Sequence, residues 1–171
     1  MEFKDYKIEE FLNDLSSPLP APGGGSVAGL VAALSGSLNS MVYSLTINKK
    51  AFEKQDVETQ KLVLDFKEAS AKFTKKALTL MEEDREEFNK LMDCYKLPKE
   101  TEEEKEFRNK EIKQKTIKAM MAPKKLGEEC YKFYDNIDAA IKYGNKMLVS
   151  DGVCAAILLN AAIESAIINV K

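Results

Sequence analysis

Residues 20–29 have the sequence Pro20-Ala21-Pro22-Gly23-Gly24-Gly25-Ser26-Val27-Ala28-Gly29, and they lead into a segment without a charged residue until Lys49. Three consecutive glycines disrupt a helix interior, but at the start of a helix they let backbone amides approach a bound group closely. The sequence therefore predicts a helix from about residue 24 to about residue 47. Its first residues, Gly23, Gly24, Gly25 and Ser26, form a candidate binding site. The alternative is that the glycines only make a tight turn and permit close helix packing.

This glycine-rich turn does not match the common phosphate-binding loops. No strand precedes it and its glycines are contiguous, unlike the dinucleotide-binding fingerprint, and it lacks the Gly-Lys-Ser/Thr of nucleoside triphosphate loops. Phosphate binding at this turn is therefore not favoured.

The composition favours one domain spanning residues 1–171, since 171 residues with 44% hydrophobic content suffice for a substantial core. A net charge of −2 without a basic patch argues against nucleic-acid binding. The chain has no histidine, so any proton transfer must use Asp, Glu, Lys, Tyr or Cys. Its three cysteines form no CxxC pattern, which indicates reduced thiols in the cytoplasm and no metal site. The amino terminus carries no recognisable export signal.

Helical periodicity runs through nearly the whole chain, and no segment has the pattern of a strand. A short amphipathic helix is expected around residues 8–15, and a long one over about residues 56–92. One stripe of the long helix has steps of three or four residues, and its members are Phe66, Ala69, Phe73, Ala77, Leu80, Asp84, Phe88 and Leu91. Asp84 is its only charged member, so we expect it to face the packed side, where an unpaired carboxylate is costly. The alternative is that the helix turns there and Asp84 joins its acidic neighbours in solvent.

Further helices are expected beyond Pro98: a charged one starting near Lys99, another with Ile112, Ile117 and Met120, and an apolar stripe after Pro123. The last helix is predicted over residues 153–170, with Ser150-Asp151-Gly152 as its cap. The architecture is thus an all-α single-domain bundle of about six helices. The uncharged helix at residues 24–47 is long enough to span a membrane, but its serines, glycines and Asn39 favour packing inside a bundle or across a subunit interface.

Several short motifs occur in order along this chain. They are Pro-Gly-Gly-Gly-Ser at 22–26, Asp84, Leu97-Pro98-Lys99, Arg108, Pro123, Gly144-Asn145, Ser150-Asp151-Gly152-Val153 and Asn169-Val170. In this set and order the chain resembles the cyclodeaminase/cyclohydrolase family, over about residues 8–171. The resemblance implies an all-helical subunit that forms a homodimer, with a pocket for a reduced folate near the dimer contact. The reactions of this family require no cofactor, and the composition of the uncharged helix does not favour a membrane.

The resemblance implies one of two reactions. A formiminotetrahydrofolate cyclodeaminase converts 5-formiminotetrahydrofolate to 5,10-methenyltetrahydrofolate and ammonia. A methenyltetrahydrofolate cyclohydrolase adds water to the methenyl ring and gives 10-formyltetrahydrofolate. Both need a group that moves protons and a surface that holds the two nitrogens together. The alternative from another class is a non-catalytic helical dimer module.

For the proton carrier, the sequence favours Asp84, since burial raises a carboxyl pKa toward neutrality. Asp151 is the second candidate carboxylate, with helix capping as its alternative role. Lys99 and Arg108 are candidates for contacts with the folate's glutamate or a reacting nitrogen, and otherwise are surface charges. Asn145 offers an amide for the pteridine, and otherwise ends a helix in a left-handed conformation.

Overall fold

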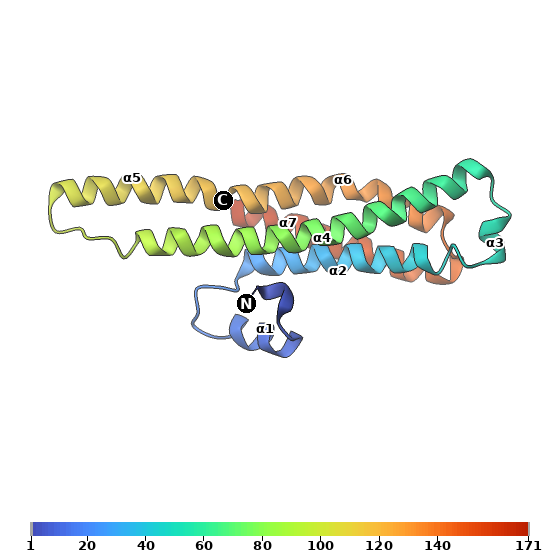
Figure 1. The fold of residues 1–171 in the computed structure, drawn as a ribbon, viewed down its shortest axis with the longest axis horizontal. Helices are drawn as coiled ribbons and strands as arrows, with labels where there is room; N and C mark the ends of the chain where they lie inside the picture. Colours follow the sequence, from blue (N-terminus) through green and yellow to red (C-terminus); the bar gives the residue numbers. More distant parts are fainter. Residues whose placement is uncertain (1, 171) are drawn as a thin grey trace.

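The computed structural model of this chain describes residues 2–170 and shows an elongated helical bundle (Figure 1). Its helices of eight residues or more are α1 (Ile8–Leu15), α2 (Gly24–Ser44), α4 (Val57–Cys94), α5 (Glu102–Ala119), α6 (Met121–Tyr143) and α7 (Val149–Val170). The short α3 (Lys50–Glu53) and two 3-10 turns, Phe3–Asp5 and Lys146–Leu148, complete the described elements. No strand occurs between residues 2 and 170, which confirms the all-α prediction.

Helix α2 packs along α4 and α7 and also contacts α6 (Figure 1). Its glycines are needed for this approach. A Cβ at Gly29 would lie 2.7 Å from the Cβ of Met81, and one at Gly36 would lie 2.6 Å from Thr74 Oγ1. The prediction that small residues let α2 pack closely is therefore confirmed.

Three polar residues of α2, Ser26, Ser35 and Asn39, are buried, whereas Ser37 is exposed. Ser35 donates a hydrogen bond to the Ala155 carbonyl at 2.7 Å. The Asn39 amide donates to Asn136 Oδ1 at 2.8 Å and to Ser70 Oγ at 3.1 Å. These buried bonds explain much of the polarity of an otherwise uncharged helix, because Ser35 and the Asn39 amide nitrogen pair with neighbouring helices. Asn39 Oδ1 has no hydrogen-bonding partner among the described residues.

The apolar stripes predicted on α4 and α6 form the main core. Phe73 of α4 stacks on Phe133 of α6 with 4.0 Å between ring centroids. Ala77, Leu80 and Ile137 are almost fully buried in the same cluster. Periodicity was sufficient to assign these faces because both helices follow an uninterrupted 3.6-residue repeat.

Three details of the prediction are wrong. The charged segment and the segment with Ile112 and Ile117 form one helix, α5, capped by Thr101. Helix α7 begins at Val149, so Ser150-Asp151-Gly152 lies inside its first turn and caps nothing. The prediction missed this start because a 3-10 turn leads directly into α7, with the Asn145 side chain accepting a hydrogen bond from the Met147 amide.

Asn145 also does not end α6 in a left-handed conformation, since its φ is −61°. Pro123 lies in the first turn of α6, where a missing amide hydrogen costs little.

Two helical segments, residues 24–44 and 146–170, are long and apolar enough to cross a bilayer by length and composition alone. They differ in their surroundings: 56% of the apolar window in the first is buried by the bundle, against 22% in the second. Helix α7 therefore presents an apolar surface that the rest of the described chain leaves open.

Candidate active site

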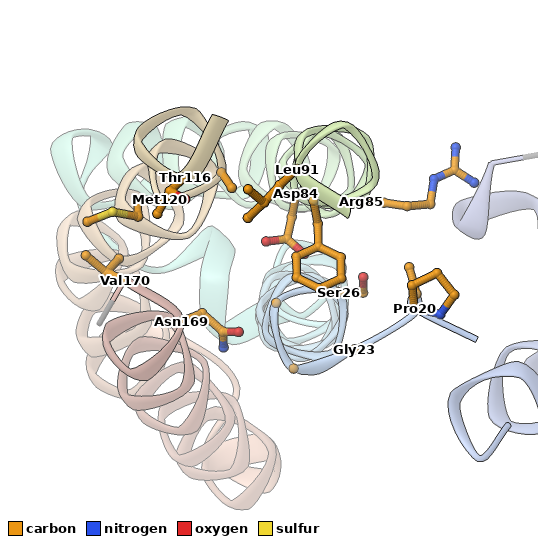
Figure 2. Close-up of a pocket in the computed structure, with 15 residues that line it drawn as sticks. Pro20, Gly23, Ser26, Asp84, Arg85, Leu91, Thr116, Met120, Asn169 and Val170 are labelled. Carbon is orange, nitrogen blue, oxygen red and sulfur yellow. The ribbon is translucent and has the colours of Figure 1, made fainter. Parts of the chain in front are cut away.

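A cavity of about 330 Å³ opens where the start of α2, the carboxyl-terminal third of α4 and the ends of α5 and α7 meet (Figure 2). The loop before α2 closes another side through Pro20 and Ala21. The lining residues are Pro20, Ala21, Gly23, Gly24, Gly25, Ser26, Asp84, Arg85, Phe88, Leu91, Thr116, Ala119, Met120, Asn169 and Val170. This volume lies within the range of small-molecule sites. Five of the candidate site residues named from the sequence line the cavity: Gly23, Gly24, Gly25, Ser26 and Asp84.

Asp84 projects from α4 toward the start of α2 (Figure 2). Its carboxylate lies so close to Gly25 that a Cβ at that position would overlap both carboxylate oxygens. Only glycine leaves this space, and no residue between 2 and 170 has a positive φ. The first glycine-rich turn therefore serves close approach rather than an unusual backbone conformation.

The Asp84 carboxyl group has no ion-pair or hydrogen-bonding partner among the described residues, in contrast to its neighbour Glu82. Burial alone raises the pKa of Asp84 to about 6, from an ordinary value of 3.8. Such a group is mostly ionised at neutral pH, and it exchanges protons readily in both directions. A perturbed carboxyl in an open cavity is a candidate for proton transfer.

Polar groups of α2 face the same space. Helix α2 starts at Gly24 with no side-chain cap, so the amides of its first turn lack helical acceptors. The Ser26 side chain is 1% exposed, and its Oγ has no hydrogen-bonding partner in the described structure. An orphaned buried hydroxyl beside free amides provides donors for a polar ligand.

Among the lining residues that the sequence did not identify as site residues, Asn169 and Arg85 are two with polar side chains. Asn169 of α7 faces Gly24, and a Cβ at Gly24 would lie 3.3 Å from its amide (Figure 2). Asn169 Nδ2 donates to the Ser165 carbonyl at 2.8 Å. Its polarity within an apolar helix was the available signal, but its partner is 145 positions away in the chain.

Arg85, the second, lines the cavity while its guanidinium turns toward the amino-terminal segment (Figure 2). It lies 4.7 Å from the centroid of Phe3 and 3.1 Å from Glu82 Oε2. Glu82 in turn accepts a hydrogen bond from the Lys4 backbone at 3.0 Å. This set attaches the amino-terminal turn to α4 beside the cavity wall.

Residues 7–171 match the family described as Formiminotransferase-cyclodeaminase. The chain belongs to this family. It is 32% identical over 163 residues to a methenyltetrahydrofolate cyclohydrolase of Methylorubrum extorquens, covering 95% of this chain and 76% of the relative. It is also 32% identical over 166 residues to the formimidoyltransferase-cyclodeaminase of Rattus norvegicus, covering 97% of this chain and 30% of the relative.

The fold agrees with a solved structure of the same family. The crystal structure of formiminotetrahydrofolate cyclodeaminase from Thermotoga maritima superposes with a TM-score of 0.84 at 26% identity, covering 99% of this chain and 78% of that one. The chain spans about a third of the length of the mammalian relative and about three quarters of the bacterial one. These relatives are named as enzymes, and the chain is a member of the same enzyme family.

The other candidates from the family resemblance lie elsewhere in this chain. Asp151 is near the start of α7, 18 residues and so about 27 Å along the helix from Asn169. Asn145 lines a different cavity at that end of the bundle. Lys99 is exposed in the loop after α4, and Arg108 donates to the Tyr95 carbonyl at 3.4 Å. Within one chain the structure thus groups Asp84 with the glycine turn and leaves these four outside the cavity.

Proposed function

We propose that this protein acts on the one-carbon bridge of a reduced folate, with 5-formiminotetrahydrofolate cyclodeamination as its reaction and Asp84 as the proton carrier. The observation that carries the proposal is the unpartnered carboxyl of Asp84, partly buried in a cavity beside the free amides at the start of α2. The family match supplies the substrate class.

The reaction needs one group that moves a proton over a short distance. N10 attacks the formimino carbon, a C–N10 bond forms, and a tetrahedral carbon results. The ionised Asp84 carboxylate takes the proton from N10 and delivers it to the amino group that leaves as ammonia, as the C–N bond to that group breaks. The positive charge stays on the folate and becomes the methenyl cation, so no cofactor takes part.

The electrostatics of the cavity suit this sequence of steps. The substrate amidinium and the methenyl product are both cations, and a carboxylate in a poorly solvated site stabilises a nearby positive charge strongly. The Ser26 hydroxyl and the first amides of α2 donate hydrogen bonds to polar edges of the ligand. Asn169 and the apolar residues Phe88, Leu91 and Met120 enclose the rest of the bound portion.

The second candidate is the methenyltetrahydrofolate cyclohydrolase reaction. The observation that favours it is the match to the Methylorubrum extorquens relative over 76% of that protein's length. Here Asp84 takes a proton from water as a C–O bond forms at the methenyl carbon. N5 then leaves that carbon and accepts this proton, while the remaining hydroxyl proton passes to solvent as the formyl C=O bond forms.

A spectrophotometric assay of the purified chain distinguishes the two reactions. Growth of methenyl absorbance together with released ammonia, starting from 5-formiminotetrahydrofolate, supports the cyclodeaminase. Loss of methenyl absorbance faster than the buffer rate supports the cyclohydrolase. The proposal fails if the folded protein accelerates neither reaction above its uncatalysed rate and also binds no reduced folate. The non-catalytic helical module is then the better description.

We extend the proposal to a homodimer formed through the exposed side of α7 and its neighbour α2. The exposed apolar residues of these helices are Leu34, Met41, Val153, Ile157, Ile167 and Ile168. A row of large apolar side chains on one helix is more than the scattered apolar exposure of a typical monomer surface. A second copy covers this surface without any membrane.

A further inference from the structure

A second cavity, of about 460 Å³, lies at the opposite end of the bundle from Asp84. One wall comes from the turn after α2 and from α3, with Thr46, Lys49, Lys50, Ala51, Phe52 and Gln55. The other wall comes from the end of α6 and the turn before α7, with Lys142, Tyr143, Gly144, Asn145 and Lys146. The 21 residues of α2 separate it from the first cavity by about 30 Å, so it is not part of the same binding site.

The charge of this cavity is one-sided. Four of its lining residues are lysines and none is acidic. None of these four lysines forms an ion pair with any residue from 2 to 170, whereas lysines on other surfaces do, such as Lys72 with Glu68 at 2.6 Å and Lys132 with Glu129 at 3.3 Å. The whole chain carries a net charge of −2, so this group of four lysines is a local positive charge on a protein that is negative overall.

The walls of the cavity are fixed to one another by long-range hydrogen bonds. The backbone amide of Asn145 donates to Thr46 Oγ1 at 2.8 Å, and Gln55 Nε2 donates to the Tyr143 carbonyl at 2.9 Å. Gly144 permits the turn, because a Cβ there would overlap the Ala140 carbonyl oxygen. The lysines therefore project from a defined frame rather than from a loose loop.

The contacts that the four lysines make within the chain leave most of their positive charge without a neighbouring negative group. Lys146 Nζ donates to the Lys142 carbonyl at 2.8 Å and so caps the end of α6. Lys142 Nζ lies 5.1 Å from the centroid of the Tyr143 ring, and the Tyr143 hydroxyl raises the pKa of Lys142, with a smaller contribution from the Asp138 carboxylate one turn earlier. Lys49 and Lys50 form no ion pair with a described acidic residue, although Glu53 lies within one turn of both. Gln55 Oε1 is buried without a donor, which leaves one further polar atom unsatisfied beside the lysines.

We infer that this lysine-lined cavity is a binding site for a compact polyanion, a small molecule with three or more closely spaced carboxylate or phosphate groups. Several weak, exposed ammonium contacts add up only when one ligand carries several negative charges. This inference does not depend on the reaction at Asp84.

Isothermal titration calorimetry with citrate and with tripolyphosphate tests the inference on the full chain. The wild type should bind at least one probe, more weakly as salt is raised, since screening reduces such contacts. Replacing two of the four lysines, Lys49→Gln with Lys50→Gln, should weaken binding by about tenfold or more. Binding of tripolyphosphate alone identifies a phosphorylated ligand, and binding of citrate alone identifies a carboxylate ligand.

The matched control is the double variant Lys110→Gln with Lys113→Gln, which removes the same charge from exposed positions on α5. It should bind like the wild type. If neither probe binds at low salt, or if the control loses as much affinity as the cavity variant, the site does not exist. Circular dichroism melts verify that each variant is folded, and the single variant Lys142→Gln gives an independent reading from the other wall.

Discussion

The carboxylate of Asp84 on α4 lies directly against the α-carbon of Gly25 on α2, at a position where any larger residue would overlap both of its oxygens. This contact joins the glycine-rich turn to the one charged residue in the apolar stripe of α4. It also explains why the two features belong to a single site although they are 59 positions apart in the chain.

The replacement Gly25→Ala should therefore displace the Asp84 carboxylate. We expect turnover to fall by about a hundredfold or more, because a misplacement of about 1 Å at a reacting group has effects of this size. The control is Gly127→Ala, where a Cβ would meet only Ala166 at an ordinary 3.7 Å. Steady-state kinetics of the two variants measure the difference, and equal activity in both would show that the position of Asp84 does not matter.

The replacement Asp84→Asn should stabilise the protein at neutral pH. Burial raises the pKa of Asp84 to about 6 in the folded chain, above the 3.8 of the ordinary carboxyl, so ionisation costs the native state free energy. This cost is absent below about pH 4, grows as the pH rises toward 6 and is complete above it, at no more than about 3 kcal/mol. Urea unfolding of both proteins at pH 4 and pH 8 checks the sign: a variant less stable at pH 8 would contradict it.

Asn136→Ala should lower stability without changing the site. Asn136 accepts from the Asn39 and Ser70 side chains and donates to the Phe66 carbonyl at 2.9 Å. Removing it leaves buried groups unpaired, which costs about 2 to 4 kcal/mol. Denaturant unfolding measures this loss, and kcat below the melting range should stay within about twofold of the wild type since Asn136 is outside the cavity. A stability within 0.5 kcal/mol of the wild type, about the size of an ordinary surface change, would contradict the assigned network.

The exposed side of α7 should control assembly. Ile157 is 62% exposed, so Ile157→Lys changes that surface without disturbing the core. If two copies meet there, the charge leaves an uncompensated cation in an apolar interface, and light scattering should show a shift from dimer to monomer. A wild type that is already monomeric and stays in solution without detergent would rule out the proposed dimer.

Much of the cavity could be predicted from the sequence because its parts are encoded locally. The step of four residues from Leu80 to Asp84, and again to Phe88, places the carboxyl on the packed face of α4. The contiguous glycines mark the start of α2 without any tertiary information. Both are properties of single helices, and the periodicity of a single helix predicts which of its faces is buried in the folded protein.

The remaining parts of the site depend on contacts between distant segments. Asn169 reaches the cavity only because α7 packs along α2 with its end beside Gly24, and Arg85 is turned aside by Phe3 and Glu82. Asp151 shares the helix of Asn169 but lies at its other end, which motif order alone does not reveal. Neither helix pairing nor direction follows from periodicity, so these placements required the structure.

Whether Asp84 carries the proton is tested most directly by the turnover of the folate substrate by Asp84→Asn, measured together with binding of the reduced folate by the same protein. We predict binding within a few fold of the wild type and a loss of kcat of at least about a hundredfold, the usual scale for removing a proton-transfer group. Undiminished kcat in the folded variant would show that Asp84 does not carry the proton.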